Sequence, residues 1–146
     1  MKKTKWIVAS VVVLGVLLLA AGAYNGQITN QRVIDELRSN PTSERANIVM
    51  LLTFPDGKSL PVNYLREGDR VFVGADGPWW RAFQDKGAAV SLLIKGEQLT
   101  GNAKVILDDI DYTHEIFARL RPNAPTWLPD WLNGKLVVIT LSSSDS

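Results

Sequence analysis

Two basic residues of this sequence lie where they could hold an anion. Lys58 directly follows Pro55-Asp56-Gly57, a sequence typical of a turn, and Arg81 lies at the start of a predicted short helix. The free backbone amides of a helix start would assist Arg81, whereas a lysine at a hairpin tip is ordinarily only solvated. These two side chains are the candidate anion-binding residues, and an ordinary solvated surface is the alternative.

Four tryptophans beyond the N-terminal segment could supply flat apolar surface. Trp79 and Trp80 could stack on a planar ring or form a wall of its pocket; alternatively, one packs in the core and the other covers an end of the fold. Trp127 and Trp131 flank Pro129 and could form a lid, a partner surface or a membrane contact, with ordinary packing as the alternative. The sequence leaves these roles open for both pairs.

Composition excludes several kinds of chemistry in this chain. It has no cysteine and one histidine, His114, which excludes disulfides, thiolate catalysis and a multi-histidine metal site. His114 has polar neighbours and no indicated nucleophile, so a solvated helix residue is the favoured interpretation. Asp108, Asp109 and Asp111 lack the spacing of a calcium loop and are better explained as acids at a helix start. No catalytic residue and no metal ligand is therefore predicted.

An uncharged apolar segment spans residues 7–23. At about 1.5 Å per residue, a helix of this length covers most of the hydrocarbon core of a bilayer. Trp6 would then lie at the headgroup level. Three lysines precede the segment and only Arg32 follows closely, so the positive-inside rule predicts a cytoplasmic N-terminus and an extracytoplasmic domain.

Two interpretations of residues 1–23 stay open. The first is an uncleaved transmembrane anchor, which makes the chain a single-pass membrane protein. The second is a signal peptide, because Ala21-Gly22-Ala23 fits a small-x-small cleavage pattern before Tyr24. Cleavage there would release a secreted domain. The length of the segment slightly favours the anchor.

The charge balance of the remaining chain excludes one class of partner. The sequence holds 16 basic and 15 acidic side chains, and three of the basic ones lie in the first 23 residues. Without that segment, 13 basic side chains face 15 acidic ones. Because nucleic-acid binding needs a basic stripe, no nucleic-acid partner is expected.

Short β-type segments separated by turns dominate the rest of the chain. Residues 24–46 should form a linker, polar at 24–30, with a short helix at 31–39. Further helices are predicted at 79–86 and from the acids at 108–111 to a stop at Pro122, with Arg119 and Arg121 in the last turn. Residues 142–146 should form a disordered tail. Six strands are predicted, at 48–54, 60–65, 70–74, 89–94, 98–107 and 135–141. The first three should be antiparallel neighbours, and the strands at 89–94 and 98–107 should form a hairpin through Lys95-Gly96-Glu97. Residues 47–141 should form a mainly β barrel with short helices.

The order of these segments resembles a known family. Gly-Lys-Ser at 57–59 is followed by Pro-Val-Asn-Tyr-Leu at 61–65, Arg-Glu-Gly-Asp-Arg-Val-Phe-Val at 66–73 and Gly-Pro-Trp-Trp-Arg at 77–81. Val-Ser-Leu-Leu-Ile-Lys-Gly at 90–96 and Gly-Asn-Ala-Lys-Val at 101–105 complete the series. Over residues 47–141 the chain resembles the FMN-binding split β-barrel of the pyridoxamine-phosphate-oxidase-like superfamily, in particular its deazaflavin-dependent nitroreductase branch.

The resemblance implies a six-stranded split β-barrel that binds FMN or a deazaflavin in a groove, usually at a homodimer interface. The cofactor carries the hydride chemistry, so an oxidoreductase acting on nitro or quinone-like substrates is implied without a dedicated acid or base. The residues that match the family's cofactor contacts are Lys58, Ser59, Pro61, Val62, Asn63, Gly74, Ala75, Gly77, Trp79, Trp80 and Arg81.

Departures from the family pattern leave an alternative function open. The family turn is commonly Gly-Arg-Lys-Ser-Gly; here the arginine and the second glycine are replaced, and Asp56 adds a negative charge. Ala82 stands where relatives commonly have asparagine. A lost cation and a gained acid disfavour a bound phosphate. The alternative is a non-catalytic accessory or binding subunit of a membrane complex, at the outer membrane face, that binds no cofactor.

Overall fold

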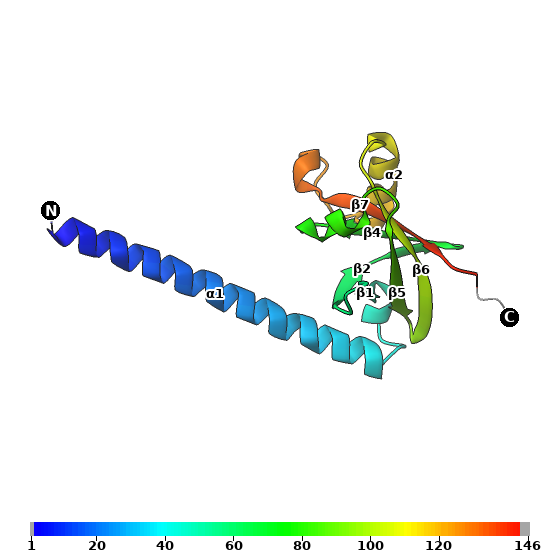
Figure 1. The fold of residues 1–146 in the computed structure, drawn as a ribbon, viewed down its shortest axis with the longest axis horizontal. Coiled ribbons are helices and arrows are strands. Elements are labelled where there is room, and N and C mark those ends of the chain that lie inside the picture. The colour runs from blue at the N-terminus through cyan, green and yellow to red at the C-terminus, as the bar shows by residue number, and fades with distance from the viewer. Residues whose placement is uncertain (1, 144–146) are drawn as a thin grey trace.

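A computed structural model describes residues 2–143 as one long helix attached to a curled β-sheet (Figure 1). The helices are α1 (Lys2–Ser39) and α2 (Ile110–Leu120), with 3₁₀ turns η1 (Arg45–Asn47), η2 (Pro78–Phe83) and η3 (Asp130–Leu132). The strands are β1 (Val49–Thr53), β2 (Ser59–Asn63), β3 (Leu65–Glu67), β4 (Arg70–Ala75), β5 (Ala88–Ile94), β6 (Glu97–Ile106) and β7 (Lys135–Leu141). Most of the tail predicted at 142–146 lies outside the described residues.

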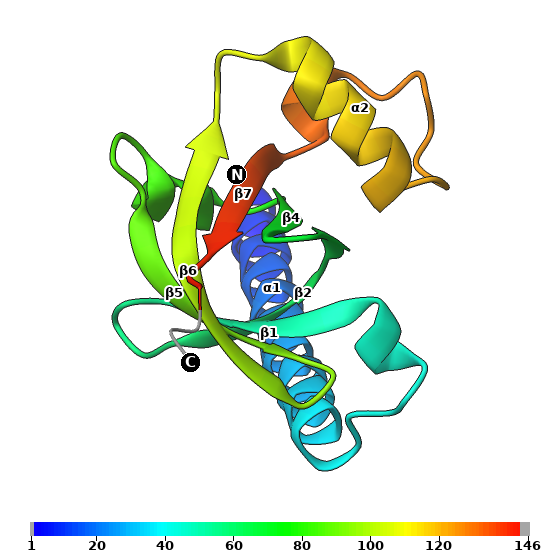
Figure 2. The same cartoon turned by 90° about the vertical axis from the view of Figure 1, so that its right-hand side faces the viewer.

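Within residues 2–143, seven strands form one antiparallel sheet in the order β2-β1-β5-β6-β7-β4-β3. Its two edge strands, β2 and β3, follow each other in the chain, with Tyr64 alone between them. The sheet therefore curls so that its edges approach each other, which gives a half-barrel (Figure 2). The predicted mainly β domain is confirmed in this form, consistent with a split barrel.

The strand predicted at 60–65 is two strands, so the count is seven and the predicted six is wrong. The Tyr64 backbone N–H donates to the Ile48 carbonyl (3.0 Å) and continues the β1–β2 ladder, and the chain then crosses to the opposite edge. There Leu65 lies opposite Phe72 of β4. The predicted pairing of 60–65 with 70–74 therefore holds for Leu65 and is wrong for residues 60–63, which pair with β1 instead.

Outside this crossover, short sequence motifs for turns and helix starts predict the structure correctly. The predicted hairpin of β5 and β6 closes through Lys95 and Gly96, whose φ angles of 49° and 81° suit a tight two-residue turn. The predicted helix after residue 109 is α2, where the Asp109 carboxylate accepts the backbone N–H of Tyr112 (3.0 Å). The helix predicted at 79–86 is the shorter η2.

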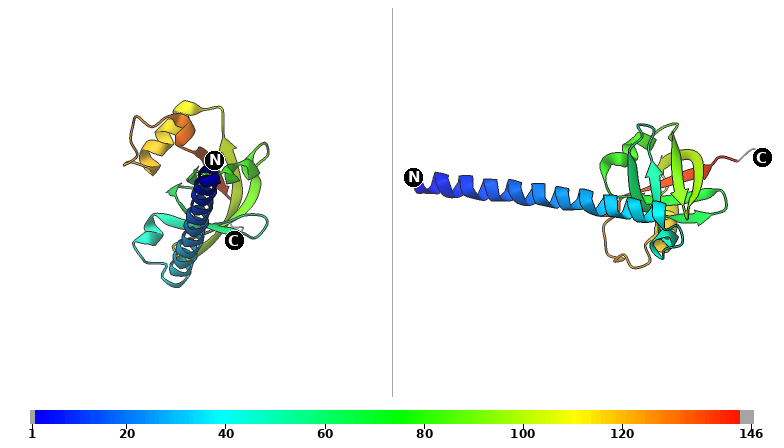
Figure 3. Two further views of the ribbon diagram at one scale, coloured as in Figure 1. Left: turned by 90° about the vertical axis from the view of Figure 1, so that its left-hand side faces the viewer. Right: turned by 90° about the horizontal axis from the view of Figure 1, so that it is seen from below.

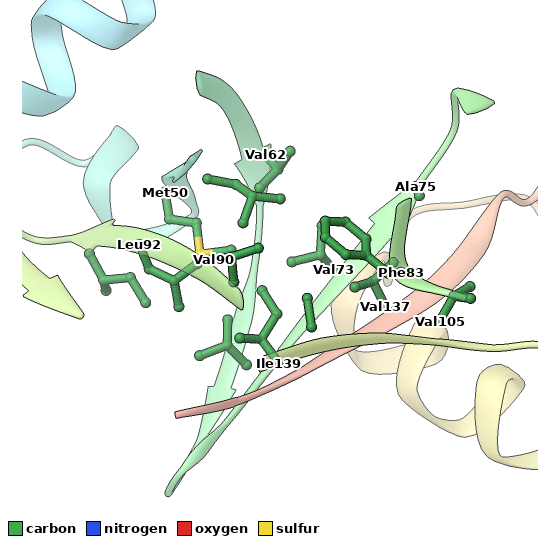
Figure 4. Packing of buried hydrophobic residues seen from close by; sticks show 14 residues of the cluster. Met50, Val62, Val73, Ala75, Phe83, Val90, Leu92, Val105, Val137 and Ile139 are labelled. Carbon is green, nitrogen blue, oxygen red and sulfur yellow. The ribbon is translucent and has the colours of Figure 1, made fainter. Parts of the chain in front are cut away.

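Apolar side chains fill the concave face of the sheet (Figure 4). Val73 of β4, Phe83 of η2 and Val137 of β7 are fully buried there, and Met50 of β1 packs against the same cluster. A second cluster joins α2 to the other face through Phe72, Ile116 and Phe117. The buried Phe83 fixes the position of η2, and with it one wall of the site described below.

Helix α1 is continuous, which corrects the polar linker predicted at 24–30. No proline interrupts this stretch, and extending an existing helix costs far less than starting a second one. Only the last turns of α1 touch the sheet, where Ile34 and Leu37 are buried against Ala46 and Leu51. The remainder projects away from the half-barrel (Figures 1 and 3).

Among the described residues, α1 is the single helix that is long and apolar enough to cross a membrane. This finding concerns length and composition, and a signal sequence at an N-terminus has the same two features. None of the most apolar 18-residue window is buried against the half-barrel. The apolar segment predicted at 7–23 is thus helical and free of protein contact.

Candidate functional site

Two adjoining hollows run along β2. The larger, of about 490 Å³, extends from the turn after β1 to η2; its lining residues are Phe54, Asp56, Lys58, Ser59, Leu60, Pro78, Trp79 and Ala82. The smaller, of about 240 Å³, extends toward β4; its lining residues are Leu60, Pro61, Val62, Asn63, Gly74, Asp76, Trp79 and Arg121. The two hollows share Leu60 and Trp79, so they form one surface, here called the β2 groove.

The turn between β1 and β2 is closed by its own hydrogen bonds. Phe54 donates its backbone N–H to the Lys58 carbonyl (2.8 Å), and Gly57 donates to the Phe54 carbonyl (2.9 Å). The Lys58 backbone N–H donates to the Asp56 carboxylate (3.0 Å). Gly57 has a φ of 86°, which suits a residue without a side chain. These three backbone N–H groups already have acceptors and do not form an anion cradle.

Trp79 combines the two roles that the sequence left open. Its ring meets Phe54 edge-on at 5.7 Å between centroids and Phe83 edge-on at 6.1 Å, while Phe54 and Phe83 stack at 5.5 Å. Phe83 is fully buried, so this trio anchors η2 to the core. The same indole is half-buried and lines both hollows.

At the turn end of the groove, Lys58 faces an acid. Its Nζ lies 3.8 Å from the Asp56 carboxylate, and the two side chains are 85% and 58% exposed. An exposed pair of this kind contributes about 0–1 kcal/mol to stability. It nevertheless offsets the positive charge that a bound anion would meet.

At the β4 end of the groove, Arg121 is held by four hydrogen bonds. Its guanidinium donates to both carboxylate oxygens of Asp76 (2.9 and 3.0 Å), to the Asn133 carbonyl (2.9 Å) and to the Gly74 carbonyl (3.2 Å). A Cβ on Gly74 would overlap this guanidinium, so the glycine makes the close approach possible. The group also lies 5.1 Å from the centroid of Phe117. Arg121 therefore joins α2, β4 and the segment before β7, here called the Arg121 clasp.

The structure brings together seven of the predicted site residues and places four elsewhere. Ala75 is buried in the core, Gly77 lies beside Trp79, and Trp80 packs against the core cluster. Arg81 lies over the Trp80 ring, 5.6 Å from its centroid, and does not line either hollow. Lys58 and Arg81 thus do not converge on one anion position. The seven that line the groove are Lys58, Ser59, Pro61, Val62, Asn63, Gly74 and Trp79.

Sequence reasoning missed two kinds of groove residue. Phe54 and Leu60 belong to strand patterns that read as core, and only their position beside η2 gives them a second role. Asp76 and Arg121 lie 45 residues apart, a separation that no local motif relates. The one available signal was the position of Arg121 at the predicted end of α2, which indicates a cap rather than a site.

A third hollow lies between α2 and the segment that follows it. His114 donates Nε2–H to the Asp130 carboxylate (2.6 Å) across this hollow of about 240 Å³. Both side chains are about half exposed, so the predicted solvated histidine has an acidic partner but no adjacent nucleophile. Within residues 2–143, no three histidine or acidic side chains gather where they could hold a metal ion.

Tyr64, between β2 and β3, is a partly buried phenol. Burial raises the pKa of its phenol above the ordinary value of 10.0, and the nearby Arg66 guanidinium opposes part of that rise. The hydroxyl donates to the Ala46 carbonyl (3.0 Å). This hydrogen bond connects the sheet crossover to the turn that follows α1.

Comparisons with known proteins address the fold. Neither a protein-family model nor a curated protein matches this sequence. The crystal structure of a candidate pyridoxamine 5'-phosphate oxidase from Listeria innocua is similar, with a TM-score of 0.51 and 15% identity over 67% of this chain and 88% of that one. A FAD-binding protein from Mesorhizobium loti gives a TM-score of 0.42 and 15% identity over 75% and 86% of the two chains.

These identities establish a likeness of fold alone. The first structure supports the resemblance read from the sequence at that level, namely a half-barrel of the split-barrel kind. The second likeness is too low to carry an argument. A likeness of fold assigns this chain neither to a nitroreductase branch nor to a ligand.

Proposed function

We propose that this chain is a membrane-tethered half-barrel protein whose β2 groove binds a flat aromatic ring of the flavin type. The observation that carries the proposal is Trp79, an indole fixed by Phe54 and Phe83 and shared by two adjoining hollows. A fixed, half-exposed indole offers a planar apolar surface with little entropy left to lose on binding. The larger hollow is of the size that small-molecule sites have.

The residues present fit the ring of FMN or a deazaflavin. Phe54, Leu60, Pro78 and Trp79 provide apolar walls, and Asn63 offers an amide at the far end of the smaller hollow. A bound flavin supplies hydride transfer, so reduction of a nitro or quinone-like substrate is the activity proposed with it. The protein would contribute the position of the ring and the exclusion of water from one of its faces.

The residues present do not fit the phosphate. Among the groove residues, Lys58 faces Asp56 and Arg121 is bound to Asp76, so the lining carries no excess positive charge. Three backbone N–H groups of the turn, those of Phe54, Gly57 and Lys58, are already hydrogen-bonded. We therefore propose that the groove takes the ring more readily than it takes an anionic tail.

The experiment is a pair of fluorescence titrations of the full-length chain, one with riboflavin and one with FMN. Trp79→Ala should weaken riboflavin binding about 10-fold, which corresponds to about 1.4 kcal/mol. Trp80→Ala is the matched control, since Trp80 does not line the groove. The absence of binding of both flavins at millimolar concentration would end the proposal of a flavin site.

The alternative is an accessory or binding subunit without a cofactor, acting at the outer face of a membrane. The neutral lining of the groove and the hydrogen-bonded turn favour it over an FMN enzyme. Assembly as a homodimer or within a membrane complex stays a prediction for both functions. An absorption spectrum of the protein purified from its native membrane distinguishes them, because a bound flavin absorbs visible light and an accessory subunit does not.

The tether has its own test. The three lysines before the apolar segment support an arrangement with the N-terminus in the cytoplasm and the half-barrel outside it. Protease added to intact cells should then degrade the half-barrel. Protection of the half-barrel would reverse the topology, and a mature N-terminus at Tyr24 would show a secreted domain.

A further inference from the structure

The segment between α2 and β7 carries exposed aromatic surface. In this connector (residues 122–133), Trp127 and Trp131 are 78% and 77% exposed, and Leu132 is 49% exposed. A monomeric soluble domain rarely leaves two indoles this open side by side in one loop. The groove and its proposed ligand do not account for them, since neither tryptophan lines either hollow of the groove.

Hydrogen bonds within the connector and to its neighbours hold its backbone in place. The Leu132 backbone N–H donates to the Pro129 carbonyl (2.9 Å), and the Leu128 N–H donates to the Pro125 carbonyl (3.2 Å). The Asp130 carboxylate accepts from His114, and the Asn133 carbonyl accepts from Arg121. The indoles are therefore presented from a braced loop, and binding through them loses little chain entropy.

The position of the connector relative to α1 is informative. Figures 1 and 3 show the connector and η2 on the flank of the half-barrel that faces back toward the N-terminal end of α1. The apolar segment ends near Ala23, and α1 continues without a break to Ile34, its first buried residue. Eleven helical residues span about 16 Å. A bilayer crossed by the apolar segment would thus lie close to this flank.

Aromatic residues also mark both ends of the apolar segment. Trp6 and Tyr24 are 76% and 65% exposed, and they bracket the segment as interfacial residues do in membrane helices. Tyr24 marks the end of the segment nearer the half-barrel.

We infer that Trp127, Trp131 and Leu132 insert into the headgroup region of the bilayer that α1 crosses, so that the half-barrel rests on the membrane surface. This inference depends on the tether in the proposed function. Asp130 is the one charged residue of the connector, so this surface carries no positive charge and at most one negative charge. It fits a zwitterionic lipid interface and has no special attraction to anionic lipid.

A second copy of the chain is a poorer occupant. A stable protein interface buries about 800 Å² on each partner. Two indoles and a leucine provide only part of that area, at about 150–250 Å² for each fully buried aromatic side chain. Continuity with the apolar segment of α1 favours lipid.

The experiment uses the absence of cysteine from the chain, which allows one labelled site at a time. The full-length protein is reconstituted in phosphatidylcholine vesicles with Thr126→Cys carrying an environment-sensitive fluorophore; Thr126 is exposed and adjoins Trp127. The expected result is a blue shift and quenching by acyl-chain-brominated phosphatidylcholine. Gln98→Cys should show neither effect: Gln98 is exposed, and it lies in β6 two residues after Gly96, which approaches Pro41 just beyond the C-terminal end of α1. Adding anionic lipid should leave the signal unchanged.

The matched control is the Thr126→Cys protein that also carries Trp127→Ser and Trp131→Ser. These two substitutions should abolish the blue shift of the fluorophore at position 126. Circular dichroism should be unaltered, because both indoles are exposed. Vesicle flotation with identical signals at positions 126 and 98 overturns the inference and leaves the tether standing. Failure to float with the vesicles overturns the tether and the inference together. A blue shift that grows with protein density and is not quenched by brominated lipid assigns the surface to a second copy and overturns the inference.

Discussion

The two ends of the β2 groove carry two aspartate–cation pairs that differ in nearly every physical respect. Asp56 and Lys58 are two residues apart, their charged groups make one contact at 3.8 Å, and both side chains are largely exposed. Asp76 and Arg121 are 45 residues apart and make two contacts of 2.9 and 3.0 Å, and the arginine side chain is 24% exposed. An aspartate paired with a cation is therefore a loose surface contact at one end of the groove and a well-ordered structural contact at the other.

The difference shows which end is free to respond to a ligand. The Asp56–Lys58 pair is surrounded by water and can be rearranged at little cost. The Arg121 clasp also satisfies two backbone carbonyls and positions α2 against β4, so its loss would reach beyond the groove. We expect changes at the turn end to alter ligand binding, and changes at the clasp to alter stability.

Arg121→Ala should have the largest effect. Removing the guanidinium leaves the Gly74 and Asn133 carbonyls without their donor and frees the C-terminal end of α2. The free energy of unfolding should fall by about 2–3 kcal/mol, measured by urea denaturation. Arg119→Ala is the control, because Arg119 pairs with Glu67 and Glu115 on a more exposed surface. Equal losses in the two variants would show that the clasp has no special weight.

Gly74→Ala tests the same clasp from the opposite side. The added Cβ would overlap the Arg121 guanidinium, which must shift and give up part of its hydrogen bonding. A loss of about 1–2 kcal/mol is expected, less than for Arg121→Ala because the end of a long side chain can move. In an Arg121→Ala background the same substitution should cost much less. Additive losses would place the strain of Gly74→Ala elsewhere in β4.

The sequence predicted features that depend on neighbouring residues. The hairpin through Lys95 and Gly96, the Asp109 cap of α2 and the turn at Gly57 each follow from two to four adjacent side chains. The apolar segment was equally clear, because its signal is composition. Seven groove residues were also named in advance, through the family resemblance.

Features that depend on distant residues were not predictable in this way. The crossover at Tyr64 places β2 and β3 on opposite edges of the sheet, although a single residue separates the two strands. The Arg121 clasp joins three elements that pattern reasoning treats separately. Arg81 was predicted with Lys58 as an anion-binding residue because of its position at a helix start, yet in η2 it lies over the Trp80 ring.

At Tyr64, burial and a nearby charge have opposite effects on the pKa of the phenol. Burial raises the pKa of the phenol above 10.0, and Arg66, two residues on, lowers it by a smaller amount. The unfolded chain therefore releases this proton first as pH rises. The stabilising contribution is present below the unfolded pKa and is lost as pH rises through the folded pKa.

The measurement is the free energy of unfolding between about pH 9 and pH 11, for wild type and Tyr64→Phe. The wild type should lose stability more steeply, because the variant has no phenol at this position to ionise. At neutral pH the variant should be about 1 kcal/mol less stable through loss of the hydrogen bond to Ala46. Parallel pH profiles would mean that burial of the phenol has no energetic consequence.

Asp56→Asn should have the smallest effect on stability and the most selective effect on binding. The amide oxygen can still accept the Lys58 backbone N–H, so the turn should keep its shape and the free energy of unfolding should change by less than about 0.5 kcal/mol. Lys58 loses its opposing charge, which should strengthen FMN binding by a few-fold, or about 0.2–1 kcal/mol. Riboflavin, which has no phosphate, should bind as before. The gain should disappear at high salt, because the side chains involved are exposed and their interactions are screened. The measurement is a titration of both flavins into wild type and Asp56→Asn at low and high ionic strength. An equal gain for both flavins would show that Asp56 affects the ring and not the phosphate. The proposed effect of charge at the turn end of the groove would then be wrong.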